Sequence, residues 1–479
     1  MAAEQKQEAS RSAAQGGSDA PTSRLAATGI GVARANAVSF AQDAPLGGAG
    51  VAAQTADLPL MGPEPLPGED AYDSFNSPWP PIVRSLRNPE FRRFWAGNFL
   101  SNIGTWMQNI AQGWLVLQLT NSPFWLGFVG FIGSLPMLLF TLFGGVIADR
   151  VNRRTLLLFT QTAMMLQAFV MAGLAYFHVI TVGEVAILSF INGVAQAMNT
   201  PSYQAMVPQL VRRDDLTNAI ALNAAQFNMS RVIGPTLGGY AMAVFGVAGN
   251  FFLNGLSFLA VLFAIGTINY PEPEPVKRQS VWSSLREGFA YVRANPELRD
   301  LMALISGASL LLLPFLTFIP YFAKDVLGTG ERGLGFLMAC SGLGAFAAAG
   351  TIAYVGQMRH RGRLMVFSGL VVMTGVIVFS YSHIFALSAA LMGLEGFGMI
   401  FMVSTMNVCI QQLSSDEMRG RVMGIYATLF MGLPPIGSLI AGELSDKMST
   451  SHSIAAMSAT SMLCFLALFS GSKALRAFD

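Results

Sequence analysis

The sequence predicts an all-α membrane protein in which twelve transmembrane helices form two repeats of six. Hydrophobic residues make up 53% of the 479 positions and charged residues only 12%, whereas an ordinary soluble protein is about a quarter charged. The run from Phe94 to Ala148 contains 55 residues without an acid or a base. Because a membrane-spanning helix needs about 20 apolar residues, this run alone is long enough for two crossings.

Residues 1–80 differ in composition from the rest of the chain. They are rich in Ala, Gly, Ser, Gln and Pro and show no periodic apolar face, so they cannot bury enough surface to offset the entropy lost on ordering. No apolar core with a basic flank follows Met1, which argues against a signal peptide. The predicted organisation is a disordered cytoplasmic tail at 1–80, an N-terminal six-helix bundle at 81–269, a cytoplasmic linker at 270–299 and a C-terminal six-helix bundle at 300–479.

Apolar segments alternate with short polar joints from Phe94 onward. Segment length, Gly and Pro breaks and the placement of charge define the candidate membrane spans. The twelve predicted spans are 94–119, 123–148, 155–177, 184–204, 217–244, 248–269, 300–323, 333–355, 364–382, 384–408, 422–444 and 453–472.

The basic residues predict the orientation of these spans. If the amino end is cytoplasmic, the inner joints and flanks hold 21 Lys and Arg residues, and the outer joints hold three, Lys324, Arg332 and Lys447. Loops with an excess of Lys and Arg stay in the cytoplasm. Both termini are therefore predicted to be cytoplasmic.

The joint at 270–299 divides the spans into six and six. It continues into SVWSSLREGFAYVRANPELRDLM, which is typical of an amphipathic interfacial helix. RNPEFRRF (87–94) matches ANPELRDL (294–301), and VPQLVRRDDLTNAI (207–220) parallels IQQLSSDEMRGRV (410–422) at nearly the same offset. Such an internal duplication favours a solute site between the halves near the membrane midplane, the arrangement used for alternating access.

The stretch GVIADRVNRR (145–154) introduces an acid and three arginines where the second apolar segment ends. Asp149 stands at the C-terminal end of its predicted helix, where the helix dipole is negative, so a partner elsewhere is indicated. The pattern resembles the loop 2–3 signature of the major facilitator superfamily, with Asn152 in place of the usual glycine. The resemblance implies a latch that closes the cytoplasmic side against span 11, and a purely topogenic basic loop is the simpler alternative. The latch residues are Gly145, Asp149, Arg150, Arg153, Arg154, Arg419 and Arg421.

A second pattern lies in span 5. The stretch SRVIGPTLGG (230–239) resembles the GxxxGPxxGG motif of antiporters in this superfamily, although Ser230 replaces the first glycine. The resemblance implies export coupled to inward proton flow. Small residues four positions apart also let helices pack closely, so packing alone is the alternative. The motif residues are Gly234, Pro235, Gly238 and Gly239.

Arg231 and Glu395 are the charges predicted to lie deepest in the membrane. A charge at such depth is costly and usually faces a partner or a watery cavity. Glu395 lies about 11 residues into span 10, about 16 Å along a helix, and the repeat aligns it with Asn192. Acids in such sites can exchange protons during function, so Glu395 is the predicted proton carrier, with Arg231 as its counter-charge or a substrate contact. Static buried hydrogen bonding is the alternative for both residues.

Polar residues in span 1 recur at steps of four and three, which places them on one helix face. Such a face should line a cavity rather than contact lipid, with interhelical hydrogen bonding as the alternative. Gln196 and Asn199 would extend this lining. The predicted cavity residues are Asn98, Asn102, Thr105, Asn109, Gln112, Asn192, Asn223 and Asn228.

The stretches LRNPEFRRFWAGNFLSNIGTWMQN and SDEMRGRVMGIYATLFMGLPP resemble the bacterial branch of enterobactin-exporter-like and macrolide-efflux permeases. The resemblance implies a secondary active transporter in the bacterial inner membrane that exports small amphiphilic molecules, a drug or a siderophore, by proton antiport. A proton-coupled importer or facilitator is one alternative. A non-transporting membrane receptor or assembly factor is another.

The sequence contains no GxxxxGK[ST] phosphate loop, no HExxH and no Cys/His set with zinc spacing. Neither an ATP-driven pump nor an enzyme is therefore expected. We expect no cofactor and no metal, with the proton gradient as the driving force. The expected partners are a small-molecule substrate and the lipid bilayer, without nucleic acid, and the chain is expected to be monomeric.

Overall fold

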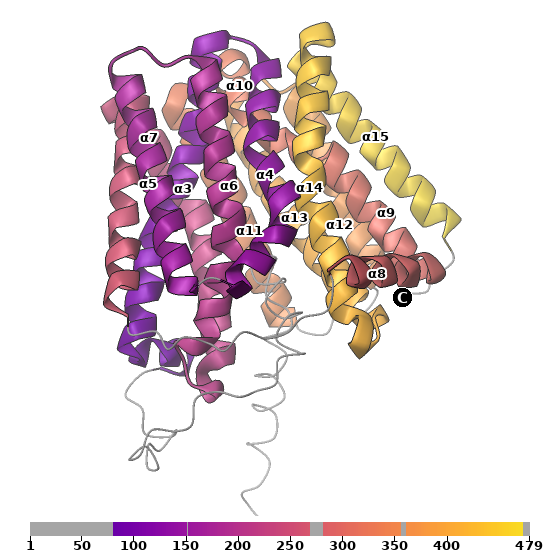
Figure 1. Ribbon diagram of the computed structural model, residues 1–479. Helices are drawn as coiled ribbons and strands as arrows, with labels where there is room; N and C mark the ends of the chain where they lie inside the picture. The colour runs from indigo at the N-terminus through magenta and orange to yellow at the C-terminus, as the bar shows by residue number, and fades with distance from the viewer. Residues whose placement is uncertain (1–79, 151, 269–280, 356–360, 473–479) are drawn as a thin grey trace, which may run out of the picture. The chain divides into compact units, whose positions relative to one another are not determined.

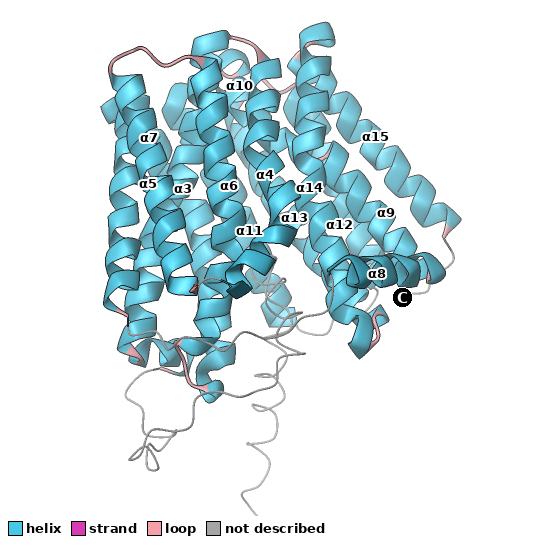
Figure 2. Cartoon of the chain, in the orientation of Figure 1, coloured by secondary structure: helices cyan, strands magenta, loops and turns pink. Residues whose placement is uncertain are grey.

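The computed structural model describes residues 80–150, 152–268, 281–355 and 361–472. The predicted tail, apart from Pro80, and the first part of the predicted linker lie outside the described residues. Within these ranges the chain is helical and contains no strand (Figures 1 and 2). The all-helical fold class predicted from the sequence is thus confirmed.

The first half of the bundle comprises the described residues up to 268. Its last long helix, α7, is interrupted at Gly246, whose φ of 70° is not helical. Glycine adopts such a backbone at little cost, and the interruption separates the predicted spans 217–244 and 248–269. The helices are η1 Pro81–Arg87, α3 Pro89–Thr120, α4 Pro123–Arg150, α5 Arg153–Tyr176, α6 Val182–Met206, η2 Val207–Gln209, η3 Arg213–Asp215 and α7 Leu216–Thr267.

The second half comprises the described residues from 281 onward. Predicted span 7 is not one regular helix, because α9 gives way to a 3₁₀ stretch, a single α-helical turn and a π-helical turn. Pro314 and Pro320 lie in this stretch, and proline lacks the N–H that a continuous helix needs. The helices are α8 Val281–Ala294, α9 Pro296–Leu311, η4 Leu313–Phe318, α10 Ile319–Tyr321, η5 Phe322–Val326, α11 Gly330–Val355, α12 Arg361–Ser380, α13 Phe385–Leu413, α14 Asp416–Met448 and α15 Thr450–Gly471.

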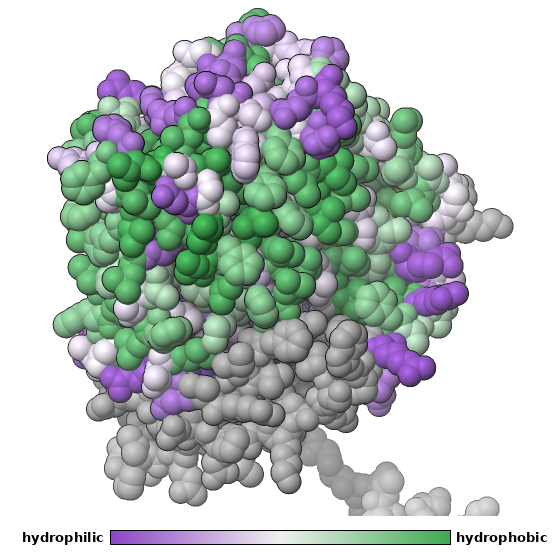
Figure 3. Space-filling view, turned by 45° about the horizontal axis from the view of Figure 1, so that its top comes forward, coloured by the Kyte–Doolittle hydropathy of each residue, from purple (hydrophilic) through white to green (hydrophobic). Residues whose placement is uncertain are grey.

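Nine helical stretches among the described residues are long and apolar enough to cross a membrane. One of them, 213–267, contains two predicted spans, and the predicted spans in α3 and α6 are not among the nine. Nine of the twelve predicted spans each overlap one α-helix, two share α7, and span 7 overlaps α9, η4, α10 and η5. The number of crossings and the cytoplasmic location of both termini remain predictions. Figure 3 shows a broad hydrophobic surface over the helices, with hydrophilic residues gathered toward its edges. Such a surface suits contact with lipid.

Two helices of the first half begin at an asparagine. The Asn88 side chain accepts hydrogen bonds from the backbone N–H groups of Glu90 (2.9 Å) and Phe91 (3.4 Å) at the start of α3. The Asn152 side chain accepts one from the backbone N–H of Thr155 (3.2 Å) at the start of α5. The asparagine that replaces the usual glycine of the loop signature therefore acts as an N-cap.

Close helix contacts recur at corresponding positions in the two halves. A Cβ on Gly193 of α6 would overlap with the carbonyl oxygen of Gly133 in α4. A Cβ on Gly396 of α13 would overlap with the carbonyl oxygen of Ser341 in α11. Gly193 directly follows Asn192, and Gly396 directly follows Glu395; these are the two polar residues that the sequence repeat aligns. The repeated pattern therefore places those two residues beside corresponding helix crossings.

The two halves contact each other where α4 meets α14 and where α7 meets α11. A Cβ on Gly127 would overlap with the carbonyl oxygen of Ser438, and a Cβ on Gly239 would lie 2.7 Å from Cα of Gly335. Small residues let the backbones approach this closely. These contacts lie toward the end of the bundle where α3 ends and α4 begins, which we call the predicted outer end.

Candidate transport site

Glu395 lies in α13, inside the second half, and is 3% exposed. The hydroxyl of Ser341, in α11, donates a hydrogen bond to its Oε2 at 2.8 Å. Its Oε1 has no hydrogen-bond partner among the described residues. Ser341 reaches the carboxyl group because Gly396 lets α11 and α13 cross without an intervening side chain. One oxygen of the group is thus held in place, while the other is available to a proton or a new partner.

Arg231 lies on α7, in the first half, and is partly buried. It precedes Pro235 by one helical turn, and the missing N–H of that proline leaves the Arg231 carbonyl without its usual helical donor. Arg231 lies beside the helix crossing that holds Glu395, because a Cβ on Gly342, which follows Ser341, would lie 3.0 Å from Cα of Val232, which follows Arg231. Opposite charges at such neighbouring positions attract each other. Since each half contributes one charge, this attraction acts between the two halves.

The attraction between Arg231 and Glu395 depends on whether Glu395 carries a proton. An ionised Glu395 attracts Arg231, whereas a protonated Glu395 carries no charge and loses that attraction. The pair can therefore couple the binding of one proton to the relative position of the two halves. Among the described residues, no group of three His, Cys, Asp or Glu side chains is placed to hold a metal ion.

The antiporter-like motif lies where α7 packs against two other helices. A Cβ on Gly234 would lie 2.9 Å from the carbonyl oxygen of Ile103, and one on Gly238 would lie 3.0 Å from Cα of Met107, both in α3. Gly239 instead faces the backbone of α11 in the second half. The motif therefore holds α7 between its own half and the other. This packing is the role that the geometry displays, and a role in proton coupling remains a prediction.

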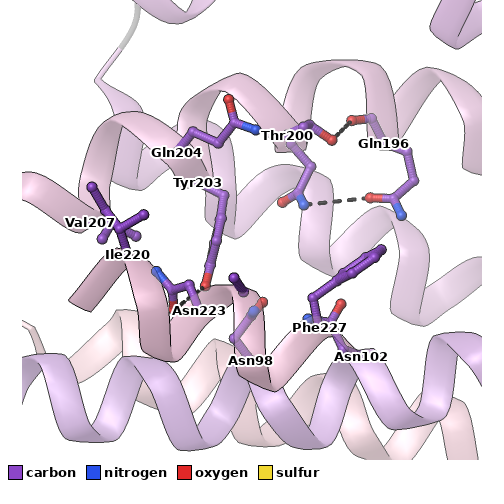
Figure 4. Close-up of a pocket in the computed structure, with 12 residues that line it drawn as sticks. Asn98, Asn102, Gln196, Thr200, Tyr203, Gln204, Val207, Ile220, Asn223 and Phe227 are labelled. Carbon is purple, nitrogen blue, oxygen red and sulfur yellow. Dashed lines mark hydrogen bonds between the residues drawn. The ribbon is translucent and has the colours of Figure 1, made fainter. Parts of the chain in front are cut away.

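A pocket of about 180 Å³ lies between α3, α6 and α7 in the first half (Figure 4). Side-chain amides from all three helices line it, together with two aromatic rings. Figure 4 shows Tyr203 pointing from α6 toward Asn223 and Asn98. The lining residues are Asn98, Asn102, Gln196, Asn199, Thr200, Tyr203, Gln204, Val207, Ile220, Asn223, Ala224 and Phe227.

Hydrogen bonds and ring contacts fix part of this lining. The Tyr203 hydroxyl donates to Oδ1 of Asn223 at 3.1 Å, and its ring stacks on Phe94 with centroids 5.0 Å apart. Oδ1 of Asn199 accepts two hydrogen bonds from side chains of α5. The pocket wall formed by α6 is therefore held by contacts with α3, α5 and α7.

The structure brings three of the eight predicted cavity residues into this pocket, namely Asn98, Asn102 and Asn223. The predicted extensions Gln196 and Asn199 line it as well. The other five do not line it. The side chains of two of these form hydrogen bonds within their own helix. The Thr105 hydroxyl donates to the carbonyl oxygen of Ser101 (2.9 Å), and the Asn228 amide donates to the carbonyl oxygen of Ala224 (2.8 Å). The five are Thr105, Asn109, Gln112, Asn192 and Asn228, and their part in transport remains a prediction.

Sequence reasoning did not identify seven of the pocket-lining residues, Tyr203 and Gln204 among them, and it did not identify Ser341. A signal for Tyr203 was present, because Gln196, Thr200 and Tyr203 follow one another at steps of four and three and so share one face of α6. For Ser341 no local signal exists, since its partner is 54 residues away.

Another polar cluster of the first half is internal to the bundle. Gln108 is 4% exposed, donates to Oε1 of Gln167 at 3.0 Å and accepts from Nδ2 of Asn254 at 2.7 Å. These three amides join α3, α5 and α7. Their mutual hydrogen bonds mark them as interhelical packing of the kind expected inside membranes, and not as a solute site.

The predicted latch is described only in part. Gly145, Asp149 and Arg150 lie in the last turns of α4, where the side chains are outside the described part of the structure. Arg154 donates to the carbonyl oxygens of Ile265 (3.1 Å) and Gly266 (2.6 Å). Arg154 thus binds the C-terminal carbonyls of α7, as basic residues near helix ends commonly do.

The span 11 side of the predicted latch lies at the start of α14. Arg421 forms an ion pair with Glu287 of α8 at 2.8 Å. Arg419 forms one with Asp416 of its own helix at 2.6 Å. These contacts tie the start of α14 to itself and to α8, which lies across the ends of neighbouring helices in Figure 1. The latch itself remains a prediction.

The sequence matches the family described as transmembrane secretion effector over residues 76–479. The staphyloferrin A transporter of Staphylococcus aureus is 26% identical over 402 residues, which cover 78% of this chain and 94% of that protein. The multidrug efflux pump Tap of Mycolicibacterium fortuitum is 25% identical, covering 74% and 88%. The enterobactin exporter EntS of Shigella boydii is 24% identical, covering 76% and 86%.

Solved transporter structures have the same fold. A POT family transporter in complex with 5-aminolevulinic acid superimposes with a TM-score of 0.65 at 10% identity, covering 81% of this chain and 97% of that chain. The nucleoside transporter NupG superimposes with a TM-score of 0.63 at 13% identity, covering 80% and 98%. At such low identity the likeness concerns the fold alone.

Proposed function

The chain belongs to the transmembrane secretion effector family of the major facilitator superfamily, and from this premise we propose that it exports small amphiphilic molecules from the cytoplasm by proton antiport. Members of this family are multi-pass transporters, and the relatives named above are transporters and not enzymes. The protein is accordingly a membrane transporter of the bacterial inner membrane. Its cargo class, its direction and its coupling to protons are the proposed part.

The pair formed by Arg231 and Glu395 is the observation that carries the proton-coupled mechanism. The two residues come from different halves and lie at the crossing of α7 and α11, where Val232 meets Gly342 and Ser341 holds Glu395. One carboxyl oxygen of Glu395 has no hydrogen-bond partner among the described residues. Proton binding to that group ends the attraction. The energy of the proton gradient is thereby applied to the contact between the halves, whose movement alternates access to the solute. No cofactor takes part in this scheme.

The proposed direction is export. The names of two relatives, a multidrug efflux pump and an enterobactin exporter, support this direction, and the glycine pattern of α7 supports antiport. The rival function is a proton-coupled importer or a facilitator. The same charged pair would serve that function with the opposite net flux, so direction requires a transport measurement.

Uptake into inside-out vesicles tests the proposal. With an acidic lumen, wild-type protein is expected to accumulate at least one of Hoechst 33342, tetracycline and a catecholate siderophore. Glu395→Gln should reduce gradient-driven uptake at least tenfold at equal protein level. The matched control is Glu443→Gln, which changes an exposed acid that pairs with Lys447 in the same helix at 2.7 Å. Full gradient-driven uptake by Glu395→Gln contradicts the coupling site, and uptake confined to right-side-out vesicles supports the importer.

We also propose that Asp149, Arg419 and Arg421 close the predicted inner end, as the loop signature implies. The ion pair between Arg421 and Glu287 shows that the start of α14 carries a base held in a defined position. Asp149→Asn should then slow transport without lowering the amount of protein in the membrane. Wild-type transport by this variant would leave the loop with a role in topology alone.

A further inference from the structure

The pocket between α3, α6 and α7 has a lining of unusual composition. Six of its twelve lining residues carry a side-chain amide, and two more carry a hydroxyl. None of the described residues that line it is charged. An amide offers both donors and acceptors of hydrogen bonds, whereas a buried ion needs a counter-charge. The lining is therefore suited to an uncharged group rich in hydrogen-bonding atoms.

Several of these amides are not used by the protein itself. Asn102 of α3 and Gln204 of α6 form no hydrogen bond with any described residue, and both are partly buried. Asn223 uses only its carbonyl oxygen, which accepts from Tyr203, so its NH₂ group remains available. Polar groups in a confined site need partners from water or a ligand. Asn102, Gln204 and Asn223 present these unused groups from three different helices.

The pocket is too small for a whole drug-sized molecule. Its volume is about 180 Å³, whereas sites for drug-sized ligands typically measure about 300–1,000 Å³. Arg231 lies close to this pocket, because the lining residue Phe227 precedes it by four residues, about 6 Å along one face of α7. One end of a larger solute can therefore occupy the pocket while the remainder lies near Arg231.

We infer that this pocket is a subsite for an uncharged, amide- or hydroxyl-bearing ring of the transported molecule. The inference rests on the proposed export function. The amides of Asn102, Gln204 and Asn223 bind the polar substituents, and the rings of Tyr203 and Phe227 contact the faces of the bound ring. Binding selects against charge at this end of the solute, while Arg231 on α7 and Glu395 on α13 are left to the proton.

Binding of three small probes to the purified full-length protein tests the subsite without requiring transport. The probes are 3-hydroxybenzamide, 3-hydroxybenzoate and 3-hydroxybenzylamine, which have nearly the same shape and are neutral, anionic and cationic at pH 7. Affinities are measured by saturation-transfer NMR titration in nanodiscs. The neutral amide is expected to bind at least tenfold more tightly than either ion. Equal binding of all three probes, or no saturable binding of the amide, overturns the inference and identifies the pocket as a water-filled space.

Substitutions place the binding in the pocket. Asn102→Leu and Gln204→Met remove amides that bond to no described residue, so the fold should be retained, and each is expected to weaken amide binding about fivefold, as the loss of one hydrogen bond does. The matched control is Gln118→Met, in the same helix as Asn102 and exposed. Unchanged affinity in both pocket variants overturns the inference.

The transport result is independent of this test. Proton-driven export by a protein that does not bind the amide contradicts the subsite alone. Selective amide binding by a protein that exports nothing contradicts the proposed function alone.

Discussion

Lys324 of η5 reaches across to the first half and donates a hydrogen bond to the carbonyl oxygen of Leu117 at 3.1 Å. The same ammonium group donates to Oδ1 of Asn121 at 2.7 Å. Asn121 ends α3 in the left-handed conformation, with φ of 49°. A base at a helix C-terminus meets the negative end of the helix dipole and its unpaired carbonyls. Lys324 therefore holds the two halves together at the predicted outer end.

Lys324→Met is expected to favour opening of the predicted outer end. The lost contact is worth about 1 kcal/mol, equivalent to about a fivefold shift in the conformational equilibrium. Electron spin resonance distances between labels at Gly183→Cys and His383→Cys, in a background without the native cysteines, measure the shift. Lys447→Met is the control, because Lys447 pairs only within α14 among the described residues. Identical distance distributions for Lys324→Met and wild type would contradict the proposed closing role.

Ser341→Ala should impair proton-coupled transport although Ser341 carries no proton. Its hydroxyl positions Oε2 of Glu395, and a hydrogen bond to a charged group is worth about 1.5–3 kcal/mol, so we expect at least a tenfold loss of gradient-driven uptake. Ser341→Thr keeps the hydroxyl and should restore most of it. Ser189→Ala is the control, since this serine is equally buried and its hydroxyl bonds to its own helix. Equal uptake by Ser341→Ala and Ser189→Ala would exclude a positioning role.

The positions of the helices could be predicted from the sequence because they depend on local length, composition and charge. The facing of polar residues could not, because it depends on which helix lies opposite. Asn102 and Asn109 share one predicted face, yet Asn102 lines the pocket and Asn109 is exposed, since the pocket covers only part of the length of α3. Gln108 lies off that face and is buried among amides of α5 and α7.

The same limit applies to the charged pair. The sequence identified Arg231 and Glu395 by their depth, which charge-free flanking segments determine. It could not supply Ser341, because that contact depends on the crossing of α11 and α13 at Gly396. A crossing between helices distant in sequence is a property of packing in three dimensions and leaves no local pattern.

Gly239→Ala is expected to disrupt the contact between α7 and α11. A Cβ at this position would lie 2.6 Å from the carbonyl oxygen of Glu331 and 2.7 Å from Cα of Gly335. Both are backbone atoms that cannot rotate away, and such overpacking costs about 1–3 kcal/mol. Melting of the purified protein and vesicle uptake should both decrease. Gly307→Ala is the control, because a Cβ there meets no atom within 4 Å. If Gly239→Ala melts and transports as wild type does, α7 and α11 can move apart without loss of stability, and the close contact is not required.

Asp215 fixes η1 to the start of α7 and provides the last prediction. It is 3% exposed, and its carboxylate pairs with Nε of Arg84 at 2.6 Å and with a terminal nitrogen of Arg87 at 3.1 Å. Asn218 strengthens the same junction, because its side-chain oxygen accepts from the backbone N–H and the hydroxyl of Ser85 at 2.9 and 2.8 Å. The segment before α3 is thus attached to the joint between α6 and α7.

Asp215→Asn leaves both guanidinium groups facing a neutral amide, and breaking the ion pairs of this buried carboxylate should cost about 3 kcal/mol. Differential scanning fluorimetry of the purified protein is then expected to show a Tm lower by roughly 5 °C. Asp214→Asn is the matched control, because Asp214 is adjacent and exposed, and its side chain forms no ion pair with described residues. That variant should melt as wild type does, since only its backbone oxygen contacts Arg84. An equal decrease in both variants would mean that negative charge at this joint, and not the buried contact with Arg84 and Arg87, stabilises the first half.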